Sequence, residues 1–216
     1  MSAELHTPSP EEFRLISDSD LSGTRFSWRG DEYTLALLGS YQYLNAINVL
    51  SCIDILRSEG LSIPDDAVRN GLEQVRWHGR FEVLRRDPIV ICDGAHNPDG
   101  IRCAADSIRL YFGDKKVALL IGVMADKEYS LYADMLGELA VQAFAVKPDN
   151  PRSLDSEKLA ETLTGRGLPT TAFADLTEGA AAAYSYAAEN NIPLIALGSL
   201  YMYRQFTAAL DRISPI

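Results

Sequence analysis

The segment DGAHNPDG, which begins at Asp93, directly follows the apolar run PIVIC and so places an acid and a histidine at the end of a buried run. Asn97 is a preferred N-cap residue and Pro98 suits the first helical position, so the segment predicts a strand that turns into a helix. Asp93 and His96 then lie beside a helix N-terminus, where backbone amides favour an anion. An acid that closes a turn and a structural histidine fit the same spacing, so the spacing alone leaves both interpretations open.

Two other polar loops also follow apolar runs. The segment GVMADK ends with Asp126 and Lys127, and the segment GSLY contains Ser199. Ligands of open parallel sheets bind beyond the carboxyl ends of the strands, so these residues are candidates for substrate contact. A solvated Asp–Lys pair that opens a helix, and a serine that caps one, are the alternatives that the spacing leaves open.

The sequence lacks the motifs that several classes of reaction need. The sequence contains no GxxxxGK[ST] P-loop, no GxGxxG, no GxSxG elbow and no Cys/His cluster, so no metal ligands are predicted. The formal net charge of −10 disfavours nucleic acid and anionic membranes as partners. Three cysteines without paired spacing, the lack of an apolar run that could span a bilayer and a polar N-terminus predict a cytoplasmic protein.

The elements that position these loops alternate regularly from Trp77 onward. Continuous apolar runs are typical of strands covered on both faces, and strand–helix alternation predicts an α/β fold with a mostly parallel sheet flanked by helices. The expected strands are 88–93, 116–123, 143–148, 170–175 and 193–199. The expected helices are 98–112, 128–141, 154–165, 177–190 and 200–211.

The first part of the chain predicts a thin domain. Residues 1–22, rich in Ser, Pro, Asp and Glu, predict extended or loop structure. The runs FSW and YTLAL around RGDE predict a hairpin, and residues 40–60 and 65–75 predict a helical pair. One hairpin and two helices enclose little core, so we expect an exposed apolar face within residues 23–75 that another segment or a partner covers.

Six motifs follow one another along the chain: LLGSYQYLNAINVL, WHGRFEV, ICDGAHNPDG, GVMADKEY, KPDNPRSL and GSLYMY. In this order they resemble the motifs of folylpolyglutamate synthases and dihydrofolate synthases, which belong to the Mur ligase superfamily. They resemble the family segments GxYQxxNA, WxGRxE, DGAHNP, GxMxDKD, PxxPR[AS]L and GSLY, with Glu128 in place of the second Asp of GxMxDKD. Any one of these motifs is weak evidence, but their common order makes a chance similarity implausible.

The resemblance implies a Rossmann-like Mur ligase C-terminal domain at 79–216, which binds glutamate, preceded at 1–78 by the incomplete end of a central ATPase domain. It implies an ATP-dependent acid–amino-acid ligase. In that reaction a carboxylate of folate or dihydropteroate is phosphorylated, and the amine of L-glutamate then displaces the phosphate to form an amide. The family's P-loop and Mg²⁺ ligands belong to an N-terminal half without counterpart in these 216 residues. We therefore expect a C-terminal fragment that is inactive alone, from a monomeric cytoplasmic parent.

The resemblance also assigns roles to individual residues. The residues that match family contacts to adenine, nucleotide, ribose and γ-phosphate are, in that order, Asn45, Arg80, Asp93 and His96. The residues that match the glutamate side are Asp126, Lys127, Ser199 and Tyr201. Arginine suits a phosphate contact because it is always charged and binds two oxygens at once. His96, near the γ-phosphate and glutamate, is the candidate catalytic residue, because an imidazole can orient either group.

Structural alternatives exist for the first two of these residues, and two other functions stay open. Asn45 could be a helix-surface amide, and Arg80 could form an ion pair with Glu82. A Mur-type ligase that adds an amino acid to a cell-wall precursor would share the fold, although the wording YQxxNA and DGAHNP favours folate. A non-catalytic Rossmann-like module that binds a partner would also fit the missing P-loop. The sequence does not distinguish dihydrofolate synthesis from polyglutamate extension or from both.

Overall fold

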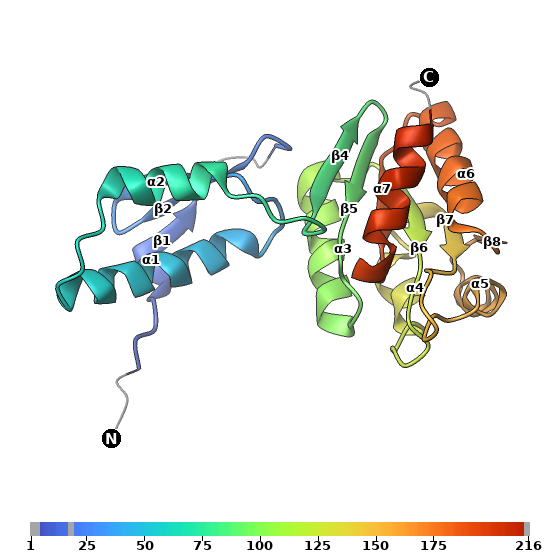
Figure 1. Ribbon diagram of the computed structural model, residues 1–216, viewed down its shortest axis with the longest axis horizontal. Coiled ribbons are helices and arrows are strands. Elements are labelled where there is room, and N and C mark those ends of the chain that lie inside the picture. The colour runs from blue at the N-terminus through green and yellow to red at the C-terminus, as the bar shows by residue number, and fades with distance from the viewer. Residues whose placement is uncertain (1–4, 17–19, 214–216) are drawn as a thin grey trace. The chain divides into compact units, whose positions relative to one another are not determined.

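The computed structural model describes residues 5–16 and 20–213 (Figure 1). The chain divides into two compact units, Met1–Trp77 and His78–Ile216, called here the N-terminal unit and the C-terminal unit. Among the described residues, no helix combines the length and the apolar character that crossing a membrane requires.

The C-terminal unit is built on a six-stranded sheet with the strand order β4-β5-β9-β6-β7-β8. The strands are β4 (Glu82–Arg86), β5 (Ile89–Cys92), β6 (Val117–Ile121), β7 (Ala140–Val146), β8 (Thr170–Phe173) and β9 (Leu194–Leu197). All neighbours pair in parallel except β4, which is antiparallel to β5. The predicted α/β fold with a mostly parallel sheet is confirmed, and β4 is the strand of this sheet that the sequence did not predict.

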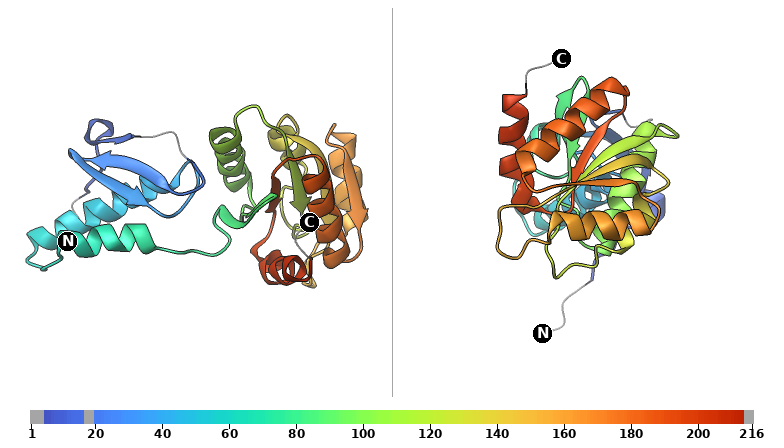
Figure 2. Two further views of the ribbon diagram at one scale, coloured as in Figure 1. Left: turned by 90° about the horizontal axis from the view of Figure 1, so that it is seen from above. Right: turned by 90° about the vertical axis from the view of Figure 1, so that its right-hand side faces the viewer.

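Helices flank this sheet on both faces (Figure 2). They are α3 (Pro98–Phe112), α4 (Leu131–Leu136), α5 (Ser156–Gly165), α6 (Leu176–Glu189) and α7 (Tyr203–Arg212), with a 3₁₀ turn, η2 (Leu200–Met202), before α7. The connections through α3, α4 and α5 all advance across the sheet in one direction, so right-handed crossovers put these helices on one face. The chain returns through α6 to β9, between β5 and β6, and α6 and α7 therefore cover the opposite face.

The packing of the core explains why the strands are uninterrupted apolar runs in the sequence. Every residue of the central strand β6 is fully buried. Leu120 belongs to the cluster that α6 and α7 cover, while its neighbours Leu119 and Ile121 point to the other face and are equally inaccessible. A strand that is covered on both faces has no position for a polar residue.

Helix α4 and strand β7 show the main differences from the expected element boundaries. Helix α4 covers only Leu131–Leu136 of the expected 128–141, because the chain turns after it and Leu139 O accepts a hydrogen bond from Val117 N of β6 at 3.0 Å. Strand β7 therefore begins at Ala140, earlier than expected, and ends at Val146.

The N-terminal unit contains a three-stranded antiparallel sheet, two helices and a short 3₁₀ turn. The elements are η1 (Pro10–Glu12), β1 (Phe13–Leu15), β2 (Thr24–Trp28), β3 (Asp31–Leu35), α1 (Gln42–Ser58) and α2 (Asp65–Gln74). The predicted hairpin is confirmed as β2 and β3, joined by Arg29 and Gly30, whose φ angles of 49° and 91° suit a two-residue hairpin turn. Strand β1 was not predicted, and residues 1–4 and 17–19 of the expected loop at 1–22 lie outside the described residues.

Helix α1 has apolar residues on two faces, of which the unit covers one. Ala46, Ile47 and Leu50 pack into a core with Phe26 and Trp28 of β2. The other face exposes a set of residues spaced three to five apart, which we call the bare face of α1: Leu44, Val49, Cys52 and Leu56. The exposed apolar face that the sequence predicted within residues 23–75 is thus confirmed.

Candidate functional site

The carboxyl ends of β5, β9 and β6 meet at one edge of the sheet, because these strands are neighbours and parallel. Backbone hydrogen bonds tie the three following loops together: Gly198 N donates to Ala95 O at 2.8 Å and Gly122 N donates to Leu197 O at 3.2 Å. Six of the predicted residues come from these loops: Asp93, His96, Asp126, Lys127, Ser199 and Tyr201. Together with Arg80, in the turn before β4 that Asp93 binds through Phe81 N, they form what we call the carboxyl-edge site.

Asp93 is held inside the site by backbone amides. Its side chain accepts hydrogen bonds from Phe81 N at 2.8 Å and from Ala95 N at 2.7 Å, and the residue is only 4% exposed. Burial raises the pKa of this carboxyl group, although the two amides and the charges of Arg80 and His96 oppose the shift. The acid therefore ties the segment around Arg80 to the loop after β5.

His96 is oriented by its own loop. The ring atom Nδ1 lies 2.7 Å from Gly94 O, and because a carbonyl oxygen can only accept, Nδ1 carries a proton. The half-buried ring therefore has Nε2 available to accept a hydrogen bond when neutral or to donate one when charged. Behind it, the Asn97 side chain accepts from Gly100 N at 2.7 Å and caps α3, which begins at Pro98 as predicted.

The glycine after Asp93 has a packing role that the sequence did not reveal. A Cβ atom at Gly94 would lie 2.5 Å from Leu200 Cδ2, and one at Gly79 would lie 2.6 Å from the same atom. The side chain of Leu200 thus occupies the space over both glycines. A side chain at either position would therefore collide with Leu200.

Ser199 and Tyr201 take different positions in the loop after β9. Ser199 is buried, and its Oγ accepts a hydrogen bond from Tyr201 N at 3.1 Å, so the serine caps the 3₁₀ turn η2. The capping role was one of the two alternatives that the sequence left open. Tyr201 is 59% exposed and offers its phenol to solvent.

Asp126 and Lys127 belong to a charged group with a member that the sequence prediction did not include. Arg152 Nη2 donates to Asp126 Oδ2 at 2.9 Å, whereas Lys127 Nζ lies 4.0 Å from that oxygen. Desolvation acts to raise the pKa of Asp126, but its own backbone amide and Arg152 outweigh it and lower the pKa. Arg152 comes from the loop after β7, which pairs with the loop after β6 through Met124 and Ser153. The motif KPDNPRSL contained Arg152, but only the pairing of the two loops brings it to Asp126.

Asn45 lies in the other unit. It is exposed on α1, and its Nδ2 donates to Gln42 Oε1 at 2.9 Å. The amide thus has a partner on its own helix, while its exposed position also suits a contact from outside the unit.

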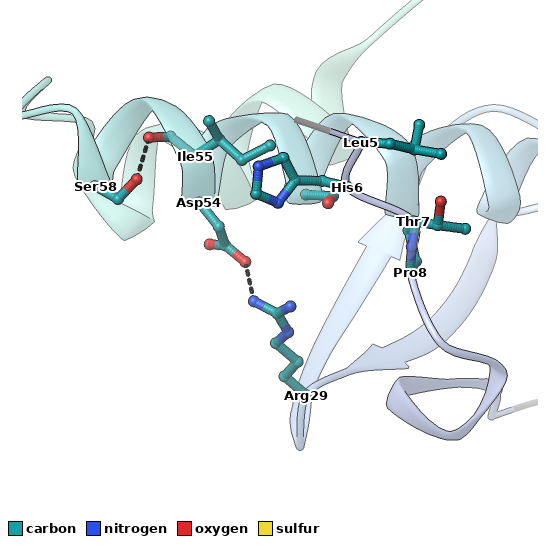
Figure 3. Close-up of a pocket in the computed structure, with 9 residues that line it drawn as sticks. Leu5, His6, Thr7, Pro8, Arg29, Asp54, Ile55 and Ser58 are labelled. Carbon is teal, nitrogen blue, oxygen red and sulfur yellow. Dashed lines mark hydrogen bonds and ion pairs between the residues drawn. The ribbon is translucent and has the colours of Figure 1, made fainter. Parts of the chain in front are cut away.

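A separate pocket of about 400 Å³ opens in the N-terminal unit (Figure 3). It is lined by Leu5, His6, Thr7, Pro8, Arg29, Ser51, Asp54, Ile55 and Ser58. Arg29 and Asp54 form an ion pair of 2.9 Å across it, and Ser58 Oγ donates to Ile55 O at 2.7 Å. None of the predicted site residues lines this pocket.

The resemblance implies ATP and Mg²⁺ as cofactors, and the described residues can be compared with each of them. A positive side chain at Arg80, whose charge acts on Asp93 in the loop that leads into the fifteen-residue helix α3, suits the phosphates of a nucleotide. In the part of the chain that the structure describes, no group of three or more His, Cys, Asp or Glu side chains could hold a metal ion. The residues around Asp93 thus suit a nucleotide phosphate.

A mostly parallel α/β sheet with charged loops at its carboxyl edge defines a Rossmann-like ligand-binding domain. The family model for the Mur ligase glutamate ligase domain matches residues 79–200, and the chain therefore belongs to the Mur ligase family.

Known relatives resemble this chain over only part of their own length. The "Probable bifunctional folylpolyglutamate synthase/dihydropteroate synthase" of Halobacterium salinarum is 32% identical over 177 residues, which are 80% of this chain and 21% of that protein. A UDP-N-acetylmuramoyl-L-alanyl-D-glutamate–2,6-diaminopimelate ligase of Caldanaerobacter subterraneus is 28% identical over 82% of this chain and 38% of its own length.

Among solved structures, the folylpolyglutamate synthase of Mycobacterium tuberculosis, complexed with ADP and AMPPCP, shares the fold. The TM-score is 0.78 at 24% identity, over 96% of this chain and 49% of that chain. The chain thus spans about half the length of this structure and smaller shares of the two sequence relatives.

Proposed function

We propose that this chain forms the C-terminal part of an ATP-dependent folylpolyglutamate or dihydrofolate synthase. In the reaction the γ-phosphoryl group of ATP passes to a carboxylate oxygen of folate or dihydropteroate, which yields an acyl phosphate and ADP. The amine of L-glutamate attacks the acyl carbon, the C–O bond to phosphate breaks, and an amide, phosphate and a proton result. The observation that carries the proposal is that Asp93, in the loop that leads into α3 of a Mur ligase domain, is influenced by the charges of Arg80 and His96 and accepts a hydrogen bond from Phe81 N, next to Arg80.

In this proposal the C-terminal unit contributes three residues with different tasks to the nucleotide side. Arg80 binds phosphate oxygens with its guanidinium group. His96 presents Nε2 toward the γ-phosphate and glutamate, and the hydrogen bond of Nδ1 to Gly94 O fixes its ring. Asp93 retains lone pairs for ribose hydroxyls, and its two backbone amides hold it in place.

The amino-acid side uses the charged group at the ends of β6 and β7. Lys127 and Arg152 offer cations to the carboxylates of L-glutamate, and Asp126 holds Arg152 through the 2.9 Å ion pair. Two cations next to the substrate overcome locally the repulsion that a chain of net charge −10 exerts on an acidic amino acid. Tyr201, with its exposed phenol, and Ser199 border this side in the proposal.

Residues 1–78 in this proposal form the end of a central ATPase domain, and residues 79–216 form the glutamate-binding domain. A further segment with the P-loop and the Mg²⁺ ligands covers the bare face of α1, where Asn45 reaches the adenine. The support is twofold: the bare face is apolar and exposed, and the matched solved structure is about twice as long as this chain.

The second candidate is a Mur-type ligase that acts on a cell-wall precursor. The observation that favours it is the diaminopimelate ligase relative, whose match extends over 82% of this chain. The two candidates share the fold and the acyl-phosphate chemistry and differ in the carboxylate that is activated.

Glutamate-dependent phosphate release from ATP and Mg²⁺ tests the proposal. We expect none from the 216-residue chain, and turnover from the extended protein, meaning the polypeptide that includes coding sequence upstream of residue 1 in the same reading frame. Dihydropteroate and tetrahydrofolate, in separate reactions, identify the acceptor, and a UDP-muramoyl dipeptide with diaminopimelate tests the second candidate. Turnover by the 216 residues alone would show that the nucleotide site has been assigned wrongly.

A further inference from the structure

Arg80 lies on a turn with an unusual backbone. Its neighbours on both sides have positive φ angles, +68° for Gly79 and +45° for Phe81. Glycine adopts this conformation freely, but phenylalanine does so rarely, so the surrounding structure must hold Phe81 in place. The ring of Phe81 is fully buried and stacks on Tyr111, which fixes the side chain but not the backbone on either side of Arg80.

Two carboxylates hold the backbone of this turn. Glu82 Oε2 accepts a hydrogen bond from Gly79 N at 2.8 Å, and Asp93 Oδ2 accepts one from Phe81 N at 2.8 Å. The amides before and after Arg80 are thus each bound to an ionisable oxygen. Charge-assisted hydrogen bonds of this kind are about twice as strong as neutral ones, so the pair fixes the direction in which Arg80 leaves the chain.

The side chain of Glu82 is held in turn by His78, which also lies next to Tyr203. Its Oε1 lies 2.8 Å from His78 Nδ1, and the same ring atom lies 3.0 Å from the hydroxyl of Tyr203 on α7. Burial, together with the hydrogen bond to Glu82, raises the pKa of Tyr203 to about 12, so the phenol keeps its proton near neutral pH. The turn is therefore connected to the sheet through Asp93 and to α7 through Glu82 and Tyr203.

We propose that Glu82 is a positioning residue for Arg80, acting with Asp93 as one of two carboxylates that set the backbone of the turn. The inference rests on the proposed function only for the role of Arg80 as a phosphate ligand. It also revises the expected role of Glu82, because the structure gives its carboxylate to Gly79 N and His78 Nδ1 rather than to the guanidinium group of Arg80.

The geometric part of the proposal can be tested on the 216-residue chain by NMR. The variants are E82A, which removes both oxygens, E82Q, which keeps one acceptor, and E189Q, a control on an exposed residue at the end of α6. In E82A we expect the Gly79 amide proton to lose its downfield shift and the Arg80 side-chain Nε–Hε vector to become more mobile in ¹⁵N relaxation. E82Q restores much of both signals, and E189Q leaves both unchanged. An E82A chain that keeps the Gly79 amide shift and the Arg80 mobility of the wild type overturns the proposal.

The functional part uses the extended protein. A misplaced phosphate ligand lowers kcat/KM for ATP, on the order of 10²-fold for displacements near 1 Å, so we expect a loss of that order in E82A, with substantial recovery in E82Q and full activity in E189Q. A fold defect would not be rescued by E82Q, and circular dichroism melting of all variants detects it. If the wild-type extended protein shows no turnover, the proposed function fails while the NMR result still decides the positioning role. If the wild type turns over and E82A matches it, the positioning role fails alone.

Discussion

The two units of this chain bury their apolar residues to very different extents. In the C-terminal unit the strand β6 is fully inaccessible, because helices cover both faces of its sheet. In the N-terminal unit the helix α1 covers one face of a small sheet and leaves Leu44, Val49 and Leu56 between 39% and 50% exposed. A helix with apolar residues on all sides is typical of an element with neighbours on all sides. The difference is that the C-terminal unit buries its central strand completely, whereas the N-terminal unit leaves one apolar face of its longest helix exposed.

The largest expected effect is on the free energy of unfolding, and it compares a buried leucine with an exposed one. Leu120→Ala in β6 removes a fully buried side chain and leaves a cavity, so we expect the free energy of unfolding of the C-terminal unit to fall by about 2–5 kcal/mol. Leu56→Ala on the bare face of α1, which is 42% exposed, changes the stability of its unit by no more than about 0.5 kcal/mol. Denaturant titration combined with amide exchange measures each unit by itself. Equal losses for the two variants would contradict the contrast between the units.

The next effect compares one candidate ligand residue from each unit in the extended protein. Arg80→Ala removes a charged phosphate contact, and we expect kcat to fall on the order of 10²–10³-fold. Asn45→Ala removes a neutral hydrogen bond, worth about 1 kcal/mol, and raises KM for ATP roughly fivefold. Steady-state kinetics with ATP as the varied substrate separates the two, and Arg80→Lys, which keeps the charge but loses the fork, falls between the wild type and Arg80→Ala. An Arg80→Ala variant with wild-type kcat refutes the assignment of Arg80.

A smaller expected effect is on the reactivity of two cysteines, which tests whether another segment covers the bare face of α1. Cys52 is exposed on the bare face of α1, whereas Cys92 is buried in β5 and burial raises the pKa of its thiol. Iodoacetamide should therefore alkylate Cys52 in the native 216-residue chain and reach Cys92 only on unfolding. In the extended protein we expect Cys52 to react roughly tenfold more slowly, which corresponds to about 1.4 kcal/mol for opening the cover. Equal rates in the two proteins, measured by peptide mass spectrometry, would mean that the bare face stays uncovered.

The smallest expected effect is on how steeply the free energy of unfolding of the C-terminal unit changes with pH. Because burial raises the pKa of Asp93 above its usual value near 3.9, the folded state binds a proton more tightly than the unfolded state. This contribution to stability is fully present below the unfolded pKa and is lost as the pH rises through the folded pKa. In Asp93→Asn the free energy of unfolding of the C-terminal unit should fall less steeply over that window. Parallel curves for wild type and variant would show that Asp93 does not titrate there, and Asp155→Asn, an exposed N-cap in the same unit, is the control.

The sequence predicted those parts of the fold that depend on local pattern. Strand β6 was predictable because its five residues are all apolar and mostly branched, as is typical of a strand covered on both faces. Strand β4 was not, because Glu82, Arg85 and Arg86 give it the appearance of a loop, and only pairing with β5 makes it a strand. The boundary of α4 was also missed, because sheet pairing rather than helix propensity decides where Ala140 belongs.

The site shows the same division between local and distant information. The loop from Asp93 to Asn97 was predictable because strand end, cap and helix start follow each other in sequence. The ion pair of Asp126 with Arg152 was not, because it depends on two loops that meet only in the folded sheet. The contact of Leu200 with Gly94 depends in the same way on the position of β9 beside β5.

Strand β4 also has a consequence for how the chain behaves at high concentration. It forms the lateral boundary of the six-stranded sheet, where unpaired backbone groups can recruit strands of other molecules and start aggregation. The register shifts between Val83 and Arg85, and such a bulge twists the strand away from a flat template. Arg85 donates to Leu210 O at 3.1 Å, and the adjacent Arg86 adds a second positive charge. The strand that was hardest to recognise in the sequence therefore carries two features, a bulge and paired positive charges, that disfavour pairing with strands of other molecules at this edge.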